Sequence, residues 1–191
     1  MENNRKLRRL TFTAMFAVIS YVVFAYGKID IPTAGGRSTA IHLANASVVL
    51  AGMFLGPVYG GLSGAIGLSL ADLMDPRYVT SAPKTFLMKF MIGFIAGALA
   101  RKLKLAEKTE HKQIVAVSGL CALAALGFNV IFDPIIGYLY KRFLLGLEPE
   151  LVAILQSWSA FSTAINAAAC LVVSVLLYLA LHKSFDKIYN R

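Results

Sequence analysis

The sequence predicts an all-α integral membrane protein with six transmembrane helices, and three observations lead to this prediction. The 191 residues are 58% hydrophobic and only 15% charged, with a mean hydropathy of +0.67, whereas soluble domains carry about 25% charged residues. Several apolar stretches approach or exceed the roughly 20 residues that a helix needs to cross the hydrocarbon. The excess of 19 basic over 10 acidic residues indicates asymmetric membrane loops and argues against binding of nucleic acid.

The apolar segments form one predicted membrane domain, residues 1–191, with spans at 10–26, 41–55, 57–74, 83–100, 114–138 and 160–181. The first span follows a basic cluster, as in a signal peptide, but further spans follow at once and favour a retained helix. Gly56-Pro57 separates the second and third spans, because proline disfavours helix in the residue before it. Pro83 suits the first turn of the fourth span.

The last two spans carry unusual features. Asp133-Pro134 is expected to kink or end the fifth helix near its far side. The stretch Leu151–Leu181 has no charged residue over 31 positions, and one helix of that length, at about 1.5 Å per residue, exceeds the thickness of the hydrocarbon. We therefore expect residues 151–159 to be interfacial or to face a cavity, and the sixth span to begin at Ala160.

The distribution of basic residues predicts the orientation. Six spans place both termini on one side, and 12 of the 19 basic residues fall in the N-terminus, the 101–112 loop and the tail after residue 182. The positive-inside rule then places both termini in the cytoplasm. The basic residues Lys141 and Arg142, on the opposite side, weigh against this orientation.

Small residues indicate where helices approach closely. Gly56, Gly60 and Gly64 form two successive GxxxG spacings, and Gly93 with Gly97 forms a third. In lipid such spacings allow backbones to come together, either within one bundle or against a partner. The glycine-rich run lacks the Gly-Lys-Ser/Thr ending of a phosphate-binding loop, so we expect no ATP site of that kind in this chain.

Ionisable and amide side chains near apolar spans are candidate functional residues, because each is costly in lipid unless it is satisfied or used. In a six-helix arrangement most of them lie toward the outer ends of the helices, where they outline a polar cavity. The candidate substrate-binding residues are Lys89, Asn129, Asp133, Tyr138, Trp158, Asn166, Asp72 and His42. Structural roles are open for each: carboxylates cap helices, amides join helices, and aromatic residues and histidine occupy the membrane interface.

No catalytic residue and no metal site is predicted. The three histidines, His42, His111 and His182, form no HExxH motif, and two of them are expected on the cytoplasmic side, away from His42. Cys121 and Cys170 each lie inside an apolar run, which is typical of packing residues. A membrane enzyme is therefore disfavoured.

The run LGPVYGGLSGAIGLSLADLMDPRYVTSAPKTFLMKFMIGFIAG follows a basic N-terminus, an Ala-rich first helix and a Gly-rich hairpin. This layout is similar to that of the substrate-binding S components of energy-coupling factor (ECF) vitamin transporters, over essentially the whole chain. The resemblance is most specific over Gly56–Gly97, toward the riboflavin, hydroxymethylpyrimidine and pyridoxine types. It implies a multi-pass protein of the prokaryotic cell membrane that captures a vitamin from outside. It also implies a transmembrane coupling subunit of the EcfT type and two cytoplasmic ATPase subunits as partners; ATP is then used by those partners, and this chain needs no cofactor.

The resemblance implies positions for both functions. The first helix of the family carries an Ala-x-x-x-Ala motif that contacts the coupling subunit, and Thr13, Ala14 and Ala17 fall on the matching stretch. Val18 stands where the second alanine after Ala14 would be, so the motif is degenerate. The family pocket lies at the outer ends of helices four to six, and the loops at 27–40 and 75–82 would cover it.

The expected substrate is a small heteroaromatic vitamin or precursor, hydroxymethylpyrimidine or pyridoxine, stacked on Tyr138 or Trp158 and hydrogen-bonded by amides and carboxylates. S components for riboflavin or pantothenate are alternatives, since Lys89 with Asp133 would suit a zwitterionic or carboxylate-bearing vitamin. An alternative of another class is a self-sufficient carrier in which Asp133 or Asp72 is proton-coupled. The absence of a detectable inverted repeat weighs against such a carrier.

Overall fold

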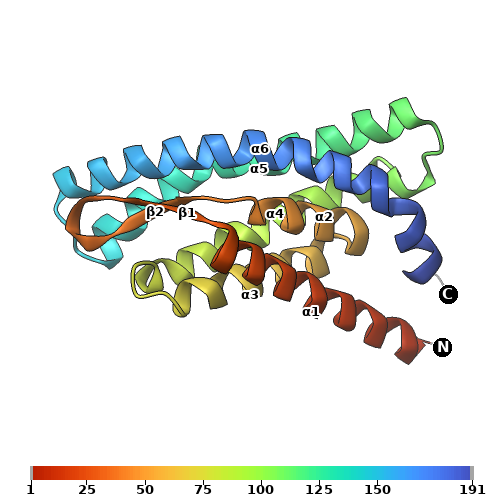
Figure 1. The fold of residues 1–191 in the computed structure, drawn as a ribbon, viewed down its shortest axis with the longest axis horizontal. Helices are drawn as coiled ribbons and strands as arrows, with labels where there is room; N and C mark the ends of the chain where they lie inside the picture. Colours follow the sequence, from red (N-terminus) through yellow and green to blue (C-terminus); the bar gives the residue numbers. More distant parts are fainter. Residues whose placement is uncertain (1, 190–191) are drawn as a thin grey trace.

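The computed structural model describes residues 2–189, and in that range the chain forms a bundle of six α-helices with one β-hairpin (Figure 1). The helices are α1 (Glu2–Gly27), α2 (Ala44–Leu55), α3 (Pro57–Leu73), α4 (Ala82–Lys102), α5 (His111–Leu139) and α6 (Pro149–Tyr189). The hairpin pairs β1 (Ile29–Pro32) with β2 (Ser38–Ile41). Short 3-10 turns η1 (Ala34–Gly36), η2 (Val79–Ser81) and η3 (Leu105–Glu107) and a π-helical turn, η4 (Tyr140–Leu144), complete the elements.

Four of the helical segments in the described range are long and apolar enough to cross a membrane: Lys6–Gly27, Val79–Lys102, His111–Leu144 and Pro149–Phe185. Helices α2 and α3, with 12 and 17 residues, measure about 18 and 25 Å, less than the roughly 30 Å of hydrocarbon. Both ends of the chain lie at the same end of the molecule (Figure 1). Six full crossings and cytoplasmic termini therefore stay predictions, and Arg5 and Arg191, counted for the orientation, lie outside the described side chains.

Helix α2 is a buried core helix. All its residues except Phe54 are buried, as expected for a helix that is apolar all round. The predicted span at 41–55 is correspondingly shorter, because residues 38–41 belong to β2 and the helix begins only at Ala44. Gly56, with φ of 87°, ends α2 and Pro57 opens α3, so the break falls where the sequence predicts it.

The glycine spacings allow close packing between helices of the same chain. A side chain at Gly60 would collide with the backbone of Gly52 on α2, and one at Gly93 would collide with the backbone of Gly60. A side chain at Gly97 would overlap the backbone at Gly56-Pro57. The spacings therefore let α2, α3 and α4 approach at backbone distance.

The last two helices differ from the expectation. Helix α5 continues through Pro134 to Leu139 and is followed by η4, so Asp133-Pro134 does not end it. Helix α6 is continuous from Pro149 to Tyr189, 41 residues and about 60 Å. Residues 151–159 are thus part of the same helix as the predicted sixth span.

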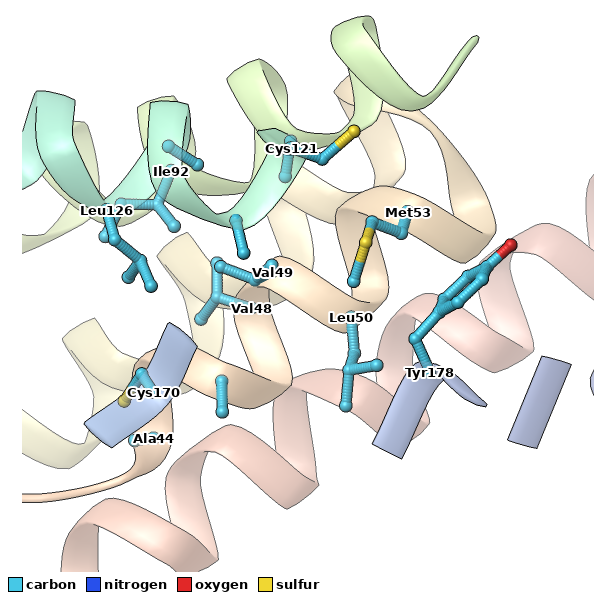
Figure 2. Close-up of a cluster of buried hydrophobic side chains, with 14 of the residues drawn as sticks. Ala44, Val48, Val49, Leu50, Met53, Ile92, Cys121, Leu126, Cys170 and Tyr178 are labelled. Atoms are coloured by element: carbon cyan, nitrogen blue, oxygen red, sulfur yellow. The ribbon is translucent and has the colours of Figure 1, made fainter. Parts of the chain in front are cut away.

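The hydrophobic core surrounds α2, as Figure 2 shows. It joins residues of α2 to residues of α4, α5 and α6, among them Val48, Val49, Leu50, Met53, Ile92, Cys121, Leu126, Cys170 and Tyr178. Both cysteines are unpaired and fully buried, in the packing role that the sequence predicts.

Candidate functional site

A polar cavity is lined by residues of the hairpin and of the neighbouring helices. The hairpin extends toward the end of the bundle opposite to the start of α1 and the end of α6 (Figure 1). The centres of water-sized spheres can move within about 120 Å³ of the cavity. Its charged lining consists of five basic side chains and two carboxylates: Arg37, Arg77, Lys84, Lys89, Lys141, Asp72 and Asp133. Serine, threonine and asparagine side chains fill much of the remaining wall, so the cavity suits a polar ligand.

Six of the eight predicted substrate-binding residues line this cavity: His42, Asp72, Lys89, Asn129, Asp133 and Asn166. Tyr138 and Trp158 do not line it. They are 37% and 44% exposed, and Trp158 packs edge-on against Phe161. The cause is helical phase, since each residue rotates the side chain by about 100°. With Asp133 and Ser159 facing the cavity, Tyr138 and Trp158 point away from it.

Both carboxylates of the cavity are engaged within the chain. Asp133 accepts a hydrogen bond from Lys84 Nζ at 2.8 Å, as an ion pair, and one from Ser159 Oγ at 3.2 Å. Asp72 accepts a hydrogen bond from Thr85 Oγ1 at 2.6 Å. Asp133 is therefore ion-paired, whereas Asp72 accepts a hydrogen bond from a neutral hydroxyl and, among the described residues, has no cation within ion-pair distance.

Asn166 and His42 join the hairpin to the bundle. Asn166 Oδ1 accepts from the backbone N–H of His42, and Asn166 Nδ2 donates to the carbonyl of Ala40, both at 2.9 Å. Burial, with a smaller contribution from the charges of Lys89 and Lys28, lowers the pKa of His42 to about 3. The imidazole is thus neutral, and its Nδ1 accepts from the N–H of Ala44. The Asn166 amide uses both its groups to hold β2.

Charged residues fasten the hairpin to the loop after α3. Lys28 binds Asp75 at 2.7 Å, and Arg77 binds Asp30 at 2.6 Å and Asp75 at 2.7 Å. Tyr78 donates from its hydroxyl to Asp30 at 2.7 Å. We call these five residues the latch.

The protonation states of the latch follow from these contacts. The Arg77 and Lys28 hydrogen bonds hold the pKa of Asp75 well below its usual range. Burial and the neighbouring Asp30 raise the pKa of Tyr78, so its hydroxyl remains a donor. Asp75 therefore stays ionised and Tyr78 stays protonated throughout the neutral range. The latch ties together the two loops that were expected to cover the pocket.

Four notable wall residues are not among those predicted from the sequence. Lys84 lies in the first turns of α4 and pairs with Asp133. Lys141 is buried and donates to Gln156 because η4 turns it inward. Asn45 lines the cavity from the first turn of α2, and an amide at the start of an apolar helix was a signal in the sequence. Tyr78 lines the cavity beside Phe24.

The predicted docking residues lie along an apolar groove between α1 and α3. Thr13 and Ala17 are buried, and the backbone of Ala17 occupies the space beside Gly67 on α3. Ala14 is exposed on the groove together with Val18. Thr13 and Ala17 are thus packed within the chain, whereas Ala14 is exposed on the groove.

The sequence model of the ECF-type riboflavin transporter S component family matches residues 4–183. The chain belongs to this family. The fold of this S component is similar to that of solved S components. One is the S component for biotin from an ECF-type ABC transporter, with a TM-score of 0.60, 23% identity and coverage of 93% of this chain and 94% of that one. Another is the S component of a bacterial ECF transporter, with a TM-score of 0.58, 18% identity and coverage of 96% and 98%. No curated protein sequence matches the chain.

Membership places the chain among substrate-binding subunits of vitamin transporters that are integral to the prokaryotic cell membrane. The family and both solved structures are transport subunits rather than enzymes. S components of ECF transporters generally associate with EcfT and ATPase subunits. The cavity beneath the latch is the candidate substrate site of this S component.

Proposed function

We propose that this S component captures a small heteroaromatic vitamin or precursor, of the hydroxymethylpyrimidine or pyridoxine type, for an ATP-driven importer. The observation that carries the proposal is the polar cavity whose cover, the β1–β2 hairpin, is fastened by the latch. A ligand enclosed in this way gives up its water on all sides, so each of its polar groups needs a protein partner. The many polar groups of the wall meet that need.

The aromatic part of the cavity supports a ring-shaped ligand. Phe24, His42 and Tyr78 line it, and the ring of Phe24 meets those of His42 and Tyr78 edge to face, with centroids 4.9 and 5.8 Å apart. Aromatic rings pack well against such edges. These three residues take the role that the sequence assigned to Tyr138 and Trp158.

Transport requires work from outside this chain. A capture protein that binds its ligand tightly releases it only if a conformation with lower affinity for the ligand is stabilised. We assign that work to a transmembrane coupling subunit of the EcfT type and two cytoplasmic ATPase subunits that use ATP. The exposed side of the α1–α3 groove, with Leu10, Ala14 and Val18, is the surface we assign to the coupling subunit. With this assignment we propose that both termini lie in the cytoplasm and that the cavity lies on the outer side.

The test is a ligand screen on the purified full-length chain in detergent, without ATP or partners. Pyridoxine, hydroxymethylpyrimidine, riboflavin and pantothenate are compared by thermal unfolding. A ligand at 1,000 times its Kd stabilises the folded state by about 4 kcal/mol, which is about 8–16 °C for a chain of this size. The variant Thr163→Trp, which fills the cavity wall, is the control and should show no shift. If no vitamin stabilises the wild-type chain, the capture function is wrong.

A further inference from the structure

The cavity contains an ammonium group, that of Lys89 on α4, that has no partner within the described part of the chain. No carboxylate there lies within ion-pair distance of Lys89 Nζ, and no hydrogen bond to it is found. Lys84 is paired with Asp133, and Lys141, which also lacks a carboxylate partner, donates a hydrogen bond to Gln156. Lys89 is half-buried, and an ammonium withdrawn from water without a partner is costly, so its presence calls for a role.

The neighbouring carboxylates do not supply that partner. Asp133 and Asp72 are near enough to interact with Lys89 electrostatically. Asp133, however, accepts hydrogen bonds from Lys84 and Ser159, and Asp72 accepts one from Thr85. Arg77 is paired with Asp30 and Asp75 in the latch, and Lys84 is paired with Asp133, so Arg37, Lys89 and Lys141 remain against Asp72 in the cavity lining. The cavity wall therefore has an excess of positive charge, which favours an anion.

Two amides in the same wall have unmet hydrogen-bonding capacity. Asn45, at the start of α2, and Asn129, on α5, are each 1% exposed, and the Oδ1 atom of each has no hydrogen-bond partner. Buried amides are normally paired, and an unpaired one costs about 1–3 kcal/mol. Asn166, in contrast, uses both its amide groups, so not every asparagine of the cavity is free for a ligand.

We propose that the vitamin presents an anionic oxygen, either a carboxylate or an ionised ring hydroxyl, to Lys89, and hydrogen-bonding groups to Asn45 and Asn129. This inference rests on the proposed capture function and narrows its substrate class. Pyridoxine fits, because its ring hydroxyl ionises while its ring nitrogen is protonated. Pantothenate and biotin fit through their carboxylates, whereas hydroxymethylpyrimidine and riboflavin offer no anionic oxygen.

The experiment uses pairs of ligands that differ in the anionic oxygen alone. Pyridoxine is compared with its 3-O-methyl ether, pantothenate with pantothenol, and biotin with its methyl ester, by calorimetry on the full-length chain in detergent. For the pair that binds, the anionic member should bind about tenfold more tightly or better, since a charge-assisted hydrogen bond is lost in the neutral one. Riboflavin and hydroxymethylpyrimidine are included as neutral vitamins.

Two variants test which residues cause the preference for the anionic member of a ligand pair. Lys89→Met keeps the length of the side chain and removes its charge, so it should abolish the preference for the anionic member. It should also raise the melting temperature of the ligand-free protein, because an unpaired, half-buried charge disappears; a purely structural lysine would lower it. Asn129→Leu should weaken both members of the pair alike without lowering the stability of the empty protein. Lys112→Met, at an exposed position, is the matched control and should change neither quantity.

The outcomes separate this inference from the capture function. Tight binding of a neutral vitamin or of both members of a pair equally, or a preference that survives in Lys89→Met, overturns the anionic class and leaves the capture function intact. Absence of binding by every compound overturns both. A preference that is lost only in Lys89→Met supports both.

Discussion

Removal of the Asp133 charge is expected to destabilise the empty protein more than any other single change to the cavity charges. The ion pair with Lys84 is buried, with side-chain exposures of 10% for Lys84 and 8% for Asp133. The substitution Asp133→Asn would leave Lys84 and Lys89, the two lysines of α4 that lie near residue 133, without a carboxylate partner in a cavity that Lys141 also lines. Among the described residues no other carboxylate lies within ion-pair distance of either one.

The magnitude follows from the asymmetry of buried pairs. Loss of one partner costs about 3–5 kcal/mol, and at about 2–4 °C per kcal/mol for a chain of 150–250 residues the melting temperature should fall by about 6–20 °C. Lys84→Met should cost less, because Lys89 lies close enough to continue neutralising Asp133. The double variant Lys84→Met with Asp133→Asn should recover much of the loss, since a buried pair replaced as a whole is close to neutral.

The assay is thermal unfolding of the four proteins in one detergent at neutral pH. Glu107→Gln is the control, because it breaks an exposed pair with Lys104 that is worth about 1 kcal/mol at most. A melting temperature of Asp133→Asn equal to that of the wild type would refute the reasoning. A double variant as unstable as Asp133→Asn alone would show that the loss comes from something other than the uncompensated lysine.

Four further predictions address packing, pH, the latch and docking. Gly67→Leu should cost about 1–3 kcal/mol or more in thermal unfolding, because its side chain would overlap the backbone of α1, whereas Gly119→Leu meets open space and should be near neutral. The pKa of His42 is lowered from 6.5 to about 3, so between these pH values the unfolded chain takes up a proton that the folded chain does not. The contribution of His42 to the free energy of unfolding is therefore complete above about pH 6.5 and falls toward pH 3 by at most about 1.4 kcal/mol per pH unit. Thermal unfolding measured against pH should show a shallower loss of stability in His42→Gln. Arg77→Met should speed vitamin dissociation about fivefold in low salt and less in high salt, since its ion pairs are partly exposed; unchanged rates would contradict the latch. Ala14→Trp should leave vitamin affinity unaltered and block uptake by the assembled importer, and normal uptake would exclude the groove as the docking surface.

The sequence predicted those parts of the fold that are determined by residues close together along the chain. The break at Gly56-Pro57 was predictable because glycine adopts positive φ and proline opens a helix. The long apolar runs that became α4, α5 and α6 were predictable from length and hydropathy. The glycine spacings were likewise informative, although only the structure shows that their partner is within the chain.

The parts that the sequence did not predict depend on distant contacts. Residues 41–55 were as apolar as a membrane span, and only the surrounding helices reveal that α2 is a short core helix. Tyr138 and Trp158 were placed in the cavity on chemistry alone, whereas helical phase points them outward. Lys141 was unpredictable for a similar reason, since one π-helical turn decides its direction.

The proposed docking groove lies between α1 and α3, and the latch residues lie in the segments that follow these two helices. These helices pack along their length, and the groove lies on one side of their contact. Just beyond one end of the pair, Lys28 follows α1, Asp75 follows α3, and the two bind each other at 2.7 Å. A partner that shifts α1 against α3 would therefore strain the Lys28–Asp75 contact directly, without a path through the core. Because a bound partner changes affinity only to the extent that it prefers one of the two arrangements, docking at the groove would open the cavity only when the ATP-driven partner prefers the shifted arrangement.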